Sequence, residues 1–260
     1  MINSGIHSDE FSVIKDFQNL SPNNFFKIIP SNNGFMLSNP ISYYLFWWAY
    51  WIAAYENLWI YEAIKIGSHL LSFLLVYKFA TDYLPQDRSV ILALAFLLYP
   101  LHESSTYVYM NIPYTLAPSL LMFAHYLIRR NKILSGLVVS FLGTFSYYVS
   151  PPYSFGLAMI FLIEKKVRKA AIFMLPGIIY LVFYLIFSYY FQDHERKLDT
   201  SLSFIELIKF FGLQIVSLIE SFIGPSYFIK IYHSLSSLSL FSCLCALPII
   251  WFLFKRKNIF

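Results

Sequence analysis

Charged residues are scarce in this sequence. Only 13% of its 260 residues are Asp, Glu, Lys or Arg, whereas 58% are hydrophobic and the mean hydropathy is +0.59. A soluble domain carries charge on about 25% of its residues, so this chain has about half the charge that a water-exposed surface needs. Lipid tolerates such a surface. The composition therefore predicts an integral membrane protein and excludes an ordinary soluble domain.

Several signatures of common enzymes and targeting segments are also missing. The only two cysteines, Cys243 and Cys245, lie in one apolar run, where neither a disulfide nor a metal site is expected. The sequence contains no glycine-rich phosphate loop, no zinc-spaced Cys/His set and no nucleophile-elbow serine. These absences argue against soluble-type ATP or serine-hydrolase chemistry. Residues 1–40 are polar and show no cleavable signal peptide.

The apolar runs predict an all-α, polytopic transmembrane helix bundle. We expect about seven spans, at residues 58–79, 89–101, 107–128, 133–149, 153–163, 170–191 and 235–254. The second and fifth are short for a membrane core that needs about 20 helical residues. Both are therefore expected to extend past the prolines beside them. The chain divides into an N-terminal segment, 1–57, and a helical bundle, 58–260.

Basic residues predict the orientation of this bundle. The formal net charge is +5, and its cations form short clusters between apolar runs, which is typical of a topology signal rather than of a nucleic-acid surface. The clusters on alternate connections are Lys78 and Arg88; Arg129, Arg130 and Lys132; Lys165, Lys166, Arg168 and Lys169; and Lys255, Arg256 and Lys257. The positive-inside rule places them in the cytoplasm. We therefore expect a multi-pass protein of a bacterial cell membrane, with its N-terminal segment outside and its C-terminus in the cytoplasm.

Two further apolar stretches predict amphipathic interfacial helices on the outer face. Residues 41–54 are too few to cross a membrane, and their Trp and Tyr content suits the headgroup level. Residues 204–223 contain Glu206 and Lys209, so an interfacial or re-entrant helix is expected there, within an outer loop at 192–234. An outer N-terminal segment without an apolar leader lacks an obvious means of export. A further helix upstream of Met1 would explain its export.

Polar residues of the N-terminal segment and of the first span are candidates for a site on the outer face. Adjacent Asp9 and Glu10 could act as a general base or bind a metal, or could form a solvated acidic turn. Glu62, Lys65 and His69 share one face of a helix. Ionisable residues within a span usually face the bundle interior or a cavity. Alternatively, Glu62 and Lys65 could pair and reach towards the interface.

Two more candidate groups lie in predicted outer connections. His102 and Glu103 could hydrogen-bond a hydroxylated ligand or could close an ordinary polar loop. Arg196 and Lys197 could hold a phosphate group or belong to a solvated loop. No cofactor is expected and no metal ligands are assigned, although the acid pair Asp9-Glu10 could bind a divalent cation.

The order of these residues resembles the C-type membrane glycosyltransferases, in particular the transmembrane part of the TMTC-like O-mannosyltransferases. These proteins have an acidic pair directly after their first helix, and their next two helices carry Tyr/His and Pro/His/Glu motifs. The corresponding positions are Asp9 and Glu10, then Tyr61 and His69, then Pro100, His102 and Glu103. Pro40 matches the proline of an Arg-Pro-Leu motif that often opens the juxtamembrane stretch of these proteins, but the Arg is missing here. The likeness covers about residues 7–130. Glu62 and Lys65 stand where the family often has His and Asn, and the family's first helix has no counterpart here.

The resemblance implies an inverting transfer of a sugar from a polyprenyl-phosphate donor to an acceptor on the outer face. Asp9 would be the general base, and Glu10 would assist it or position a ligand. The implied partners are membrane lipid and the lipid-linked sugar, and no nucleic acid; the acceptor is not indicated. The substrate-binding candidates are Lys65, His69, His102, Glu103, Arg196 and Lys197.

Two other classes of function stay open from the residues alone. A transporter or lipid flippase could use the charged face formed by Glu62, Lys65 and His69, although the inverted repeat that such proteins often show is not visible in this sequence. The chain could also be an inactive or shortened membrane protein that binds a partner, since it has about half the length of a typical C-type enzyme.

Overall fold

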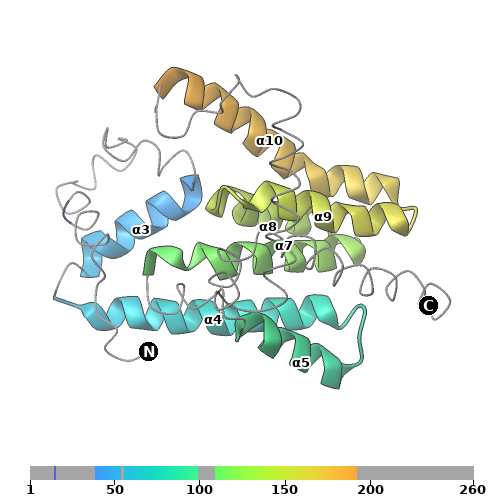
Figure 1. The fold of residues 1–260 in the computed structure, drawn as a ribbon, viewed down its shortest axis with the longest axis horizontal. Helices are drawn as coiled ribbons and strands as arrows, with labels where there is room; N and C mark the ends of the chain where they lie inside the picture. Colours follow the sequence, from blue (N-terminus) through green and yellow to red (C-terminus); the bar gives the residue numbers. More distant parts are fainter. Residues whose placement is uncertain (1–14, 16–38, 54–55, 99–108, 192–260) are drawn as a thin grey trace, which may run out of the picture. The chain divides into compact units, whose positions relative to one another are not determined.

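The structure, a computed structural model, describes residues 15, 39–53, 56–98 and 109–191 of the chain. All of them belong to one compact unit, Met1–Lys197. Within these ranges the regular structure is entirely helical, which confirms the all-α class for this part of the protein (Figure 1). The elements are α3 (Pro40–Ala53), α4 (Leu58–Ala80), α5 (Gln86–Leu97), the 3-10 helix η4 (Tyr109–Asn111), α7 (Pro113–Arg129), α8 (Ile133–Ser146), α9 (Ser150–Ile163) and α10 (Val167–Phe191).

Each predicted apolar segment between residues 41 and 191 corresponds to a helix, and prolines account for the clearest differences in boundaries. α7 begins at Pro113 rather than at residue 107 and follows η4. α9 begins at Ser150 and includes Pro151 and Pro152 in its first turn. Proline has no backbone N–H, but the first N–H groups of a helix have no partner within that helix. Both prolines therefore start α9 without breaking it.

Two of the described helices are long and apolar enough to cross a membrane, judged by length and composition: Leu58–Ala80 and Val167–Ile186. With 23 residues, α4 is about 35 Å long at the helical rise of 1.5 Å per residue. α8 and α9 are apolar but have only 14 residues each. Seven spans therefore stay a prediction. The predicted span at 235–254 and the interfacial helix at 204–223 lie outside the described residues.

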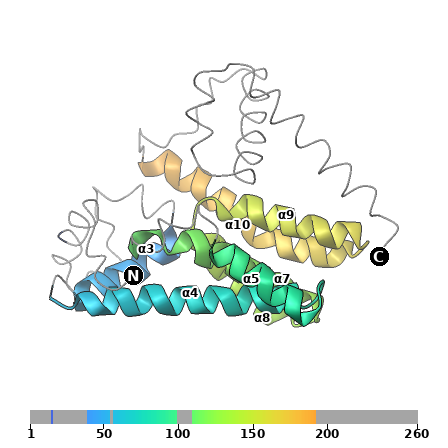
Figure 2. The ribbon, with the colours of Figure 1, turned by 60° about the horizontal axis from the view of Figure 1, so that its bottom comes forward.

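Glycines allow helices α7 to α10 to pack closely as two antiparallel pairs. Gly136 of α8 lies against the side chain of Ile128, and a Cβ atom added at Gly143 would lie 3.1 Å from the carbonyl oxygen of Ala117. The two contacts run in opposite directions along α7 and α8, so these helices are antiparallel. α9 and α10 form a second such pair (Figure 2), in which Gly177 of α10 approaches α9.

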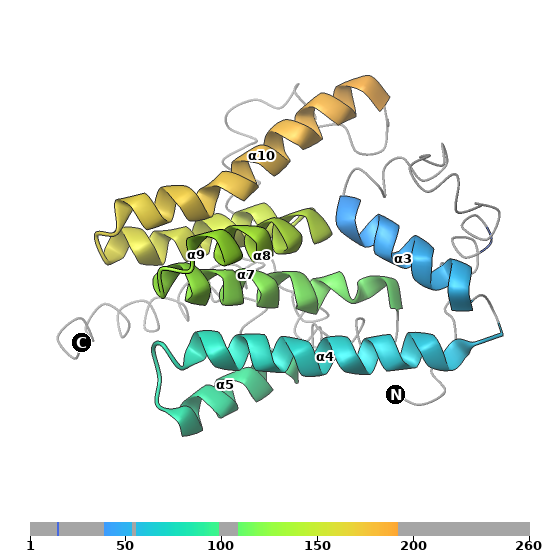
Figure 3. The same cartoon turned by 180° about the vertical axis from the view of Figure 1, so that it is seen from behind.

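α4 runs alongside α7 in the same chain direction (Figure 3). The N-terminal ends of the two helices therefore lie together, and so do their C-terminal ends. Near one end, the ring centroids of Tyr61 and Tyr109 are 5.1 Å apart. Near the other end, the rings of Phe79 and His125 are 5.4 Å apart. We call the first the aromatic end; its tyrosines are Tyr43, Tyr50, Tyr61, Tyr109, Tyr114 and Tyr147.

The second end contains the α4–α5, α7–α8 and α9–α10 connections, and we call it the basic end. Its cations are Lys78, Arg88, Arg129, Arg130, Lys132, Lys165, Lys166, Arg168 and Lys169. Ion pairs and a hydrogen bond join the three connections directly. Three of the basic clusters that predict the topology therefore lie together at one end of the helices.

Polar side chains are buried between these helices, whereas apolar side chains cover much of their outer surface. The fully buried polar residues include Lys65, Ser72, Ser89, Thr115, Ser119, His125, Ser140, Thr144, Ser150 and Ser154. The exposed apolar residues include Ile66, Leu70, Leu71 and Leu74 of α4 and Leu175, Ile178, Ile179, Leu181, Val182, Leu185 and Ile186 of α10. In a protein surrounded by water, large apolar surfaces of this kind are normally buried or covered by a partner.

Candidate functional site

A polar face on α4 contains the two sequence-predicted site residues that the structure describes. Glu62, Lys65, His69 and Ser72 are spaced by three, four and three residues, so their side chains lie on one side of the helix. The ammonium group of Lys65 is 2.8 Å from Glu62 Oε1. Lys65 is only 1% exposed. The predicted pairing of Glu62 with Lys65 is therefore confirmed, but Lys65 does not extend to the surface.

Aromatic residues from three elements pack at the same end of α4. Tyr61 lies four residues before Lys65, on the same face of the helix. Its ring is 5.6 Å from Tyr50 of α3 and 5.1 Å from Tyr109 of η4. Phe46 of α3 closes the cluster, with its ring 5.1 Å from Tyr109. Rings with polar edges therefore gather one helical turn away from a buried cation.

His69 and Ser72 continue the polar face towards the middle of α4. Both ring nitrogens of His69 and the hydroxyl of Ser72 are buried, and within the described part of the chain neither residue has a hydrogen-bond partner. Buried polar atoms usually have partners because leaving them unpaired costs about 1–3 kcal/mol. These atoms could therefore accept or donate hydrogen bonds to a polar ligand next to Lys65.

The other predicted site residues lie outside the described residues: Asp9, Glu10, His102, Glu103, Arg196 and Lys197. Whether they approach the α4 face stays a prediction. Among residues 39–53, 56–98 and 109–191, no group of three or more His, Cys, Asp or Glu side chains is arranged to hold a metal ion.

No protein-family model matches this chain, and comparison with curated proteins and with solved structures gives no match. The chemistry of the polar groups is therefore the basis for a functional proposal.

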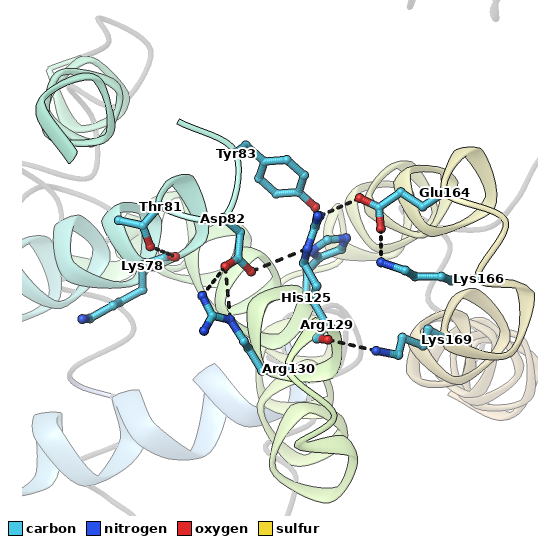
Figure 4. A network of polar contacts seen from close by, with 10 residues as sticks. All are labelled: Lys78, Thr81, Asp82, Tyr83, His125, Arg129, Arg130, Glu164, Lys166 and Lys169. Carbon is cyan, nitrogen blue, oxygen red and sulfur yellow. Dashed lines mark hydrogen bonds and ion pairs between the residues drawn. The ribbon is translucent and has the colours of Figure 1, made fainter. Parts of the chain in front are cut away.

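The basic end contains a second polar network, which the sequence did not predict (Figure 4). Asp82, just after α4, accepts hydrogen bonds from Arg130 at the end of α7, the shorter at 2.8 Å. Arg129 Nη1 donates to Glu164 Oε1 at the end of α9 over 2.6 Å, and its Nε lies 3.9 Å from Asp82 Oδ2. Arg129 therefore links the α7–α8 connection to both the α4–α5 and the α9–α10 connections. Arg130 adds a second contact to the α4–α5 connection.

Burial and neighbouring charges shift the pKa values of residues in this network in opposite directions. Burial raises the pKa of Tyr83 to about 12, although Arg129 lies 4.5 Å from its ring and opposes the shift. Burial also favours protonation of Glu164, but hydrogen bonds and charge interactions with Lys166 and Arg129 outweigh it and lower its pKa. Both groups therefore keep their ordinary charge at neutral pH, Tyr83 neutral and Glu164 negative.

A simple sequence signal accompanies this second network. Asp82 and Glu164 lie within three residues of the end of a predicted helix and near the basic clusters. The clusters indicate a membrane topology, so their cations are expected to face water or headgroups. The ion pairs that use these two carboxylates depend on how the three connections pack.

Proposed function

We propose that this chain is a multi-pass membrane protein whose basic end lies in the cytoplasm. The observation that supports this most strongly is the distribution of side chains, with polar residues buried and large apolar residues exposed along α4 and α10. Acyl chains can cover such a surface, and polar groups are then best placed between helices. The cations on the connections at the basic end fit a cytoplasmic location under the positive-inside rule.

The proposed reaction is the transfer of a sugar from a polyprenyl-phosphate donor at the aromatic end, as in the C-type membrane glycosyltransferases. The contact that supports a ligand site there is the pair of the partly exposed Glu62 with the buried Lys65. Ionisable residues within a long apolar helix are costly and usually mark a ligand or ion pathway. The Lys65 ammonium can neutralise a phosphate oxygen. Tyr50, Tyr61 and Tyr109 pack ring against ring about one helical turn away, and their rings carry hydroxyl groups at the edges.

In this proposal the N-terminal acid pair completes the reaction. The acceptor's hydroxyl oxygen forms a bond to the anomeric carbon of the sugar, and Asp9 takes the hydroxyl proton. The bond between that carbon and the phosphate oxygen breaks, and polyprenyl phosphate leaves with the electron pair. By the resemblance, Glu10 assists Asp9 or positions a ligand, and His102 and Glu103 bind the substrate. Arg196 and Lys197 are candidates for holding the donor phosphate because of their charge.

Thiol labelling of single-cysteine variants tests the orientation. Cys243 and Cys245 would first be replaced by Ser, and one cysteine would then be introduced at Asn57 or at Gln86. Both residues are exposed; Asn57 directly precedes α4, and Gln86 begins α5 after the other end of α4. A membrane-impermeant maleimide should label Asn57→Cys in intact cells and Gln86→Cys only after the cells are opened. Equal labelling in intact cells, or the reverse pattern, would contradict the proposed topology.

Turnover of lipid-linked sugar in membranes tests the chemistry. Asp9→Asn should abolish transfer while the protein stays in the membrane at its normal level. Lys65→Gln should also abolish it, measured per amount of folded protein because this change breaks the pair with Glu62. Matched controls are Asp87→Asn and Lys78→Gln, which remove the same charges at the basic end and should leave turnover unchanged. Normal turnover in Asp9→Asn would refute the assigned role of the acid pair.

A transporter or lipid flippase is the second candidate function. It is favoured by the buried ring nitrogens of His69, which extend the polar face of α4 beyond Lys65 and have no partner among the described residues. Movement of a polar headgroup along this face would require His69 but not Asp9. Loss of lipid translocation in His69→Leu, together with normal translocation in Asp9→Asn, would therefore favour this function over sugar transfer.

A further inference from the structure

We propose that the α7–α8 and α9–α10 turns together bind the headgroup of an anionic phospholipid at the basic end. This proposal rests on the membrane placement in the proposed function but is independent of sugar transfer. It assigns a ligand to a surface on the opposite end from the Glu62–Lys65 pair.

The two turns are fastened to each other by side chains of three elements. Arg129 of α7 pairs with Glu164 at the end of α9 over 2.6 Å. Lys169 of α10 donates a hydrogen bond of 2.9 Å from its ammonium group to the backbone carbonyl of Arg129. The cations that extend from these turns therefore belong to one continuous surface and can act on the same ligand.

The acids of this surface already form ion pairs, but several of its cations do not. Glu164 binds both Arg129 and Lys166, and Asp82 binds Arg130 and lies near Arg129. Lys132, Lys165 and Arg168 are exposed, and none of the carboxylates in the described ranges forms an ion pair with them. These three cations repel one another in the absence of an anion. A phosphate group between them would reduce that repulsion.

Exposed apolar residues directly beside these cations point to a lipid rather than to a dissolved anion. Leu134 is 78% exposed, Ile163 is 76% exposed and Val167 is 65% exposed. A soluble phosphate would gain nothing from these side chains. A phospholipid contacts both kinds of group, since its headgroup meets the cations and its acyl chains meet the apolar residues.

The backbone of the α9–α10 turn gives an independent way to examine Lys165. Lys165 has a φ of 59°, and Asn131, which occupies the same place in the α7–α8 turn, has a φ of 62°. Both turns are closed by the same type of backbone bond, from Lys132 N to Leu127 O and from Lys166 N to Phe161 O. Glycine or asparagine is usual at this left-handed position, and lysine is strained there. Replacing Lys165 with glycine should relieve the strain and remove the charge.

The test measures the thermal stability of the purified full-length protein in nanodiscs of phosphatidylcholine with increasing phosphatidylglycerol. We expect the Tm to rise and then saturate as phosphatidylglycerol is added, and inorganic phosphate to have no such effect. In Lys132→Gln/Lys165→Gln, the concentration of phosphatidylglycerol for the half-maximal rise should increase about tenfold. Lys165→Gly should raise the Tm in phosphatidylcholine alone but weaken the response to phosphatidylglycerol.

The matched control is Lys78→Gln/Arg88→Gln, which removes the same number of charges at the same end. Its response to phosphatidylglycerol should change less than twofold. An equal loss in both double variants would mean that the lipid responds only to overall charge, and would overturn the proposed site. An absent response in the unmodified protein would overturn it as well. Since thiol labelling tests the membrane topology separately, a failed lipid response with correct labelling contradicts this proposal alone.

Discussion

The two ends of the helical unit hold their charges in different ways. At the basic end, cations outnumber acids, and in the ion pair of Lys166 with Glu164 the two side chains are 41% and 22% exposed. At the aromatic end, Lys65 is buried beside Glu62, and tyrosines of α3, α4 and η4 pack against one another nearby. Water or headgroups can replace a lost partner at the first end. At the second, a lost partner leaves a buried charge, so equivalent substitutions should have very different effects.

The largest effect is expected when the buried pair is broken from one side. Glu62→Gln leaves the Lys65 ammonium without its carboxylate, and losses of roughly 3–5 kcal/mol are typical when one partner of a buried pair is removed. Chemical unfolding in detergent would measure the loss. Glu62→Leu/Lys65→Leu should recover most of it, because both charges are then absent. Lys166→Gln is the comparison at the basic end, where the side chains of Lys166 and Glu164 are both partly exposed and we expect little change. An equal loss there would remove the distinction between the two ends.

A smaller loss is expected where α8 packs closely on α7 near the basic end. Gly136→Ala places a methyl group against Ile128, and overpacking of this kind costs about 1–3 kcal/mol. The matched control is Gly67→Ala on α4, where an added Cβ meets nothing within 4 Å. It should be neutral or stabilising by up to about 1 kcal/mol because alanine favours helix. Equal stabilities of the two variants in detergent would contradict the close α7–α8 contact.

The sequence predicts the helices of this unit better than the interactions between them. Apolar runs locate α4, α8 and α10 closely because a helix satisfies its backbone hydrogen bonds within its own segment. The spacing of Glu62 and Lys65 predicts their shared face and their pairing. Whether Lys65 reaches the surface depends on packing between elements distant in sequence, which spacing along one helix does not describe.

The same reason explains the missed network at the basic end. Residues 82 and 129 are brought together by the parallel packing of α4 and α7, and residues 129 and 164 by the packing of α7 with α9. A count of positive charges predicts the side of the membrane on which these residues lie. It contains no information about which carboxylate will face which guanidinium.

The attachment of α3 at the aromatic end gives a third prediction. Ser42 Oγ donates a buried hydrogen bond of 2.7 Å to the carbonyl oxygen of Ser146 at the end of α8. Ser42→Ala leaves that carbonyl with one partner fewer, and a typical loss is about 1 kcal/mol. Hydrogen exchange measured by mass spectrometry should show faster exchange in α3 and unchanged exchange in α10. Faster exchange in both helices would mean that the bond stabilises the whole unit rather than α3.

The smallest effect is expected at the basic end, and it should depend on pH. The pKa of Glu164 is below its ordinary value of 4.5, because Lys166 and Arg129 together outweigh the effect of burial. A lowered pKa in the folded state means that the charged carboxylate stabilises the fold above pH 4.5 and that this contribution is lost as the pH falls through the lower, folded-state value. Because the pair is partly exposed, the contribution should be about 0.2–1 kcal/mol.

Glu164→Gln tests this contribution directly. The unfolding free energy of the variant in detergent should be slightly below that of the unmodified protein at pH 7, and the two should converge as the pH is lowered below 4.5. High salt should also reduce the difference at pH 7, because partly exposed ion pairs are screened. The Glu62→Gln difference, in contrast, should persist in salt, since little solvent reaches Lys65. Similar salt dependence at both sites would show that the aromatic end is open to water and that the two ends hold their charges in the same way.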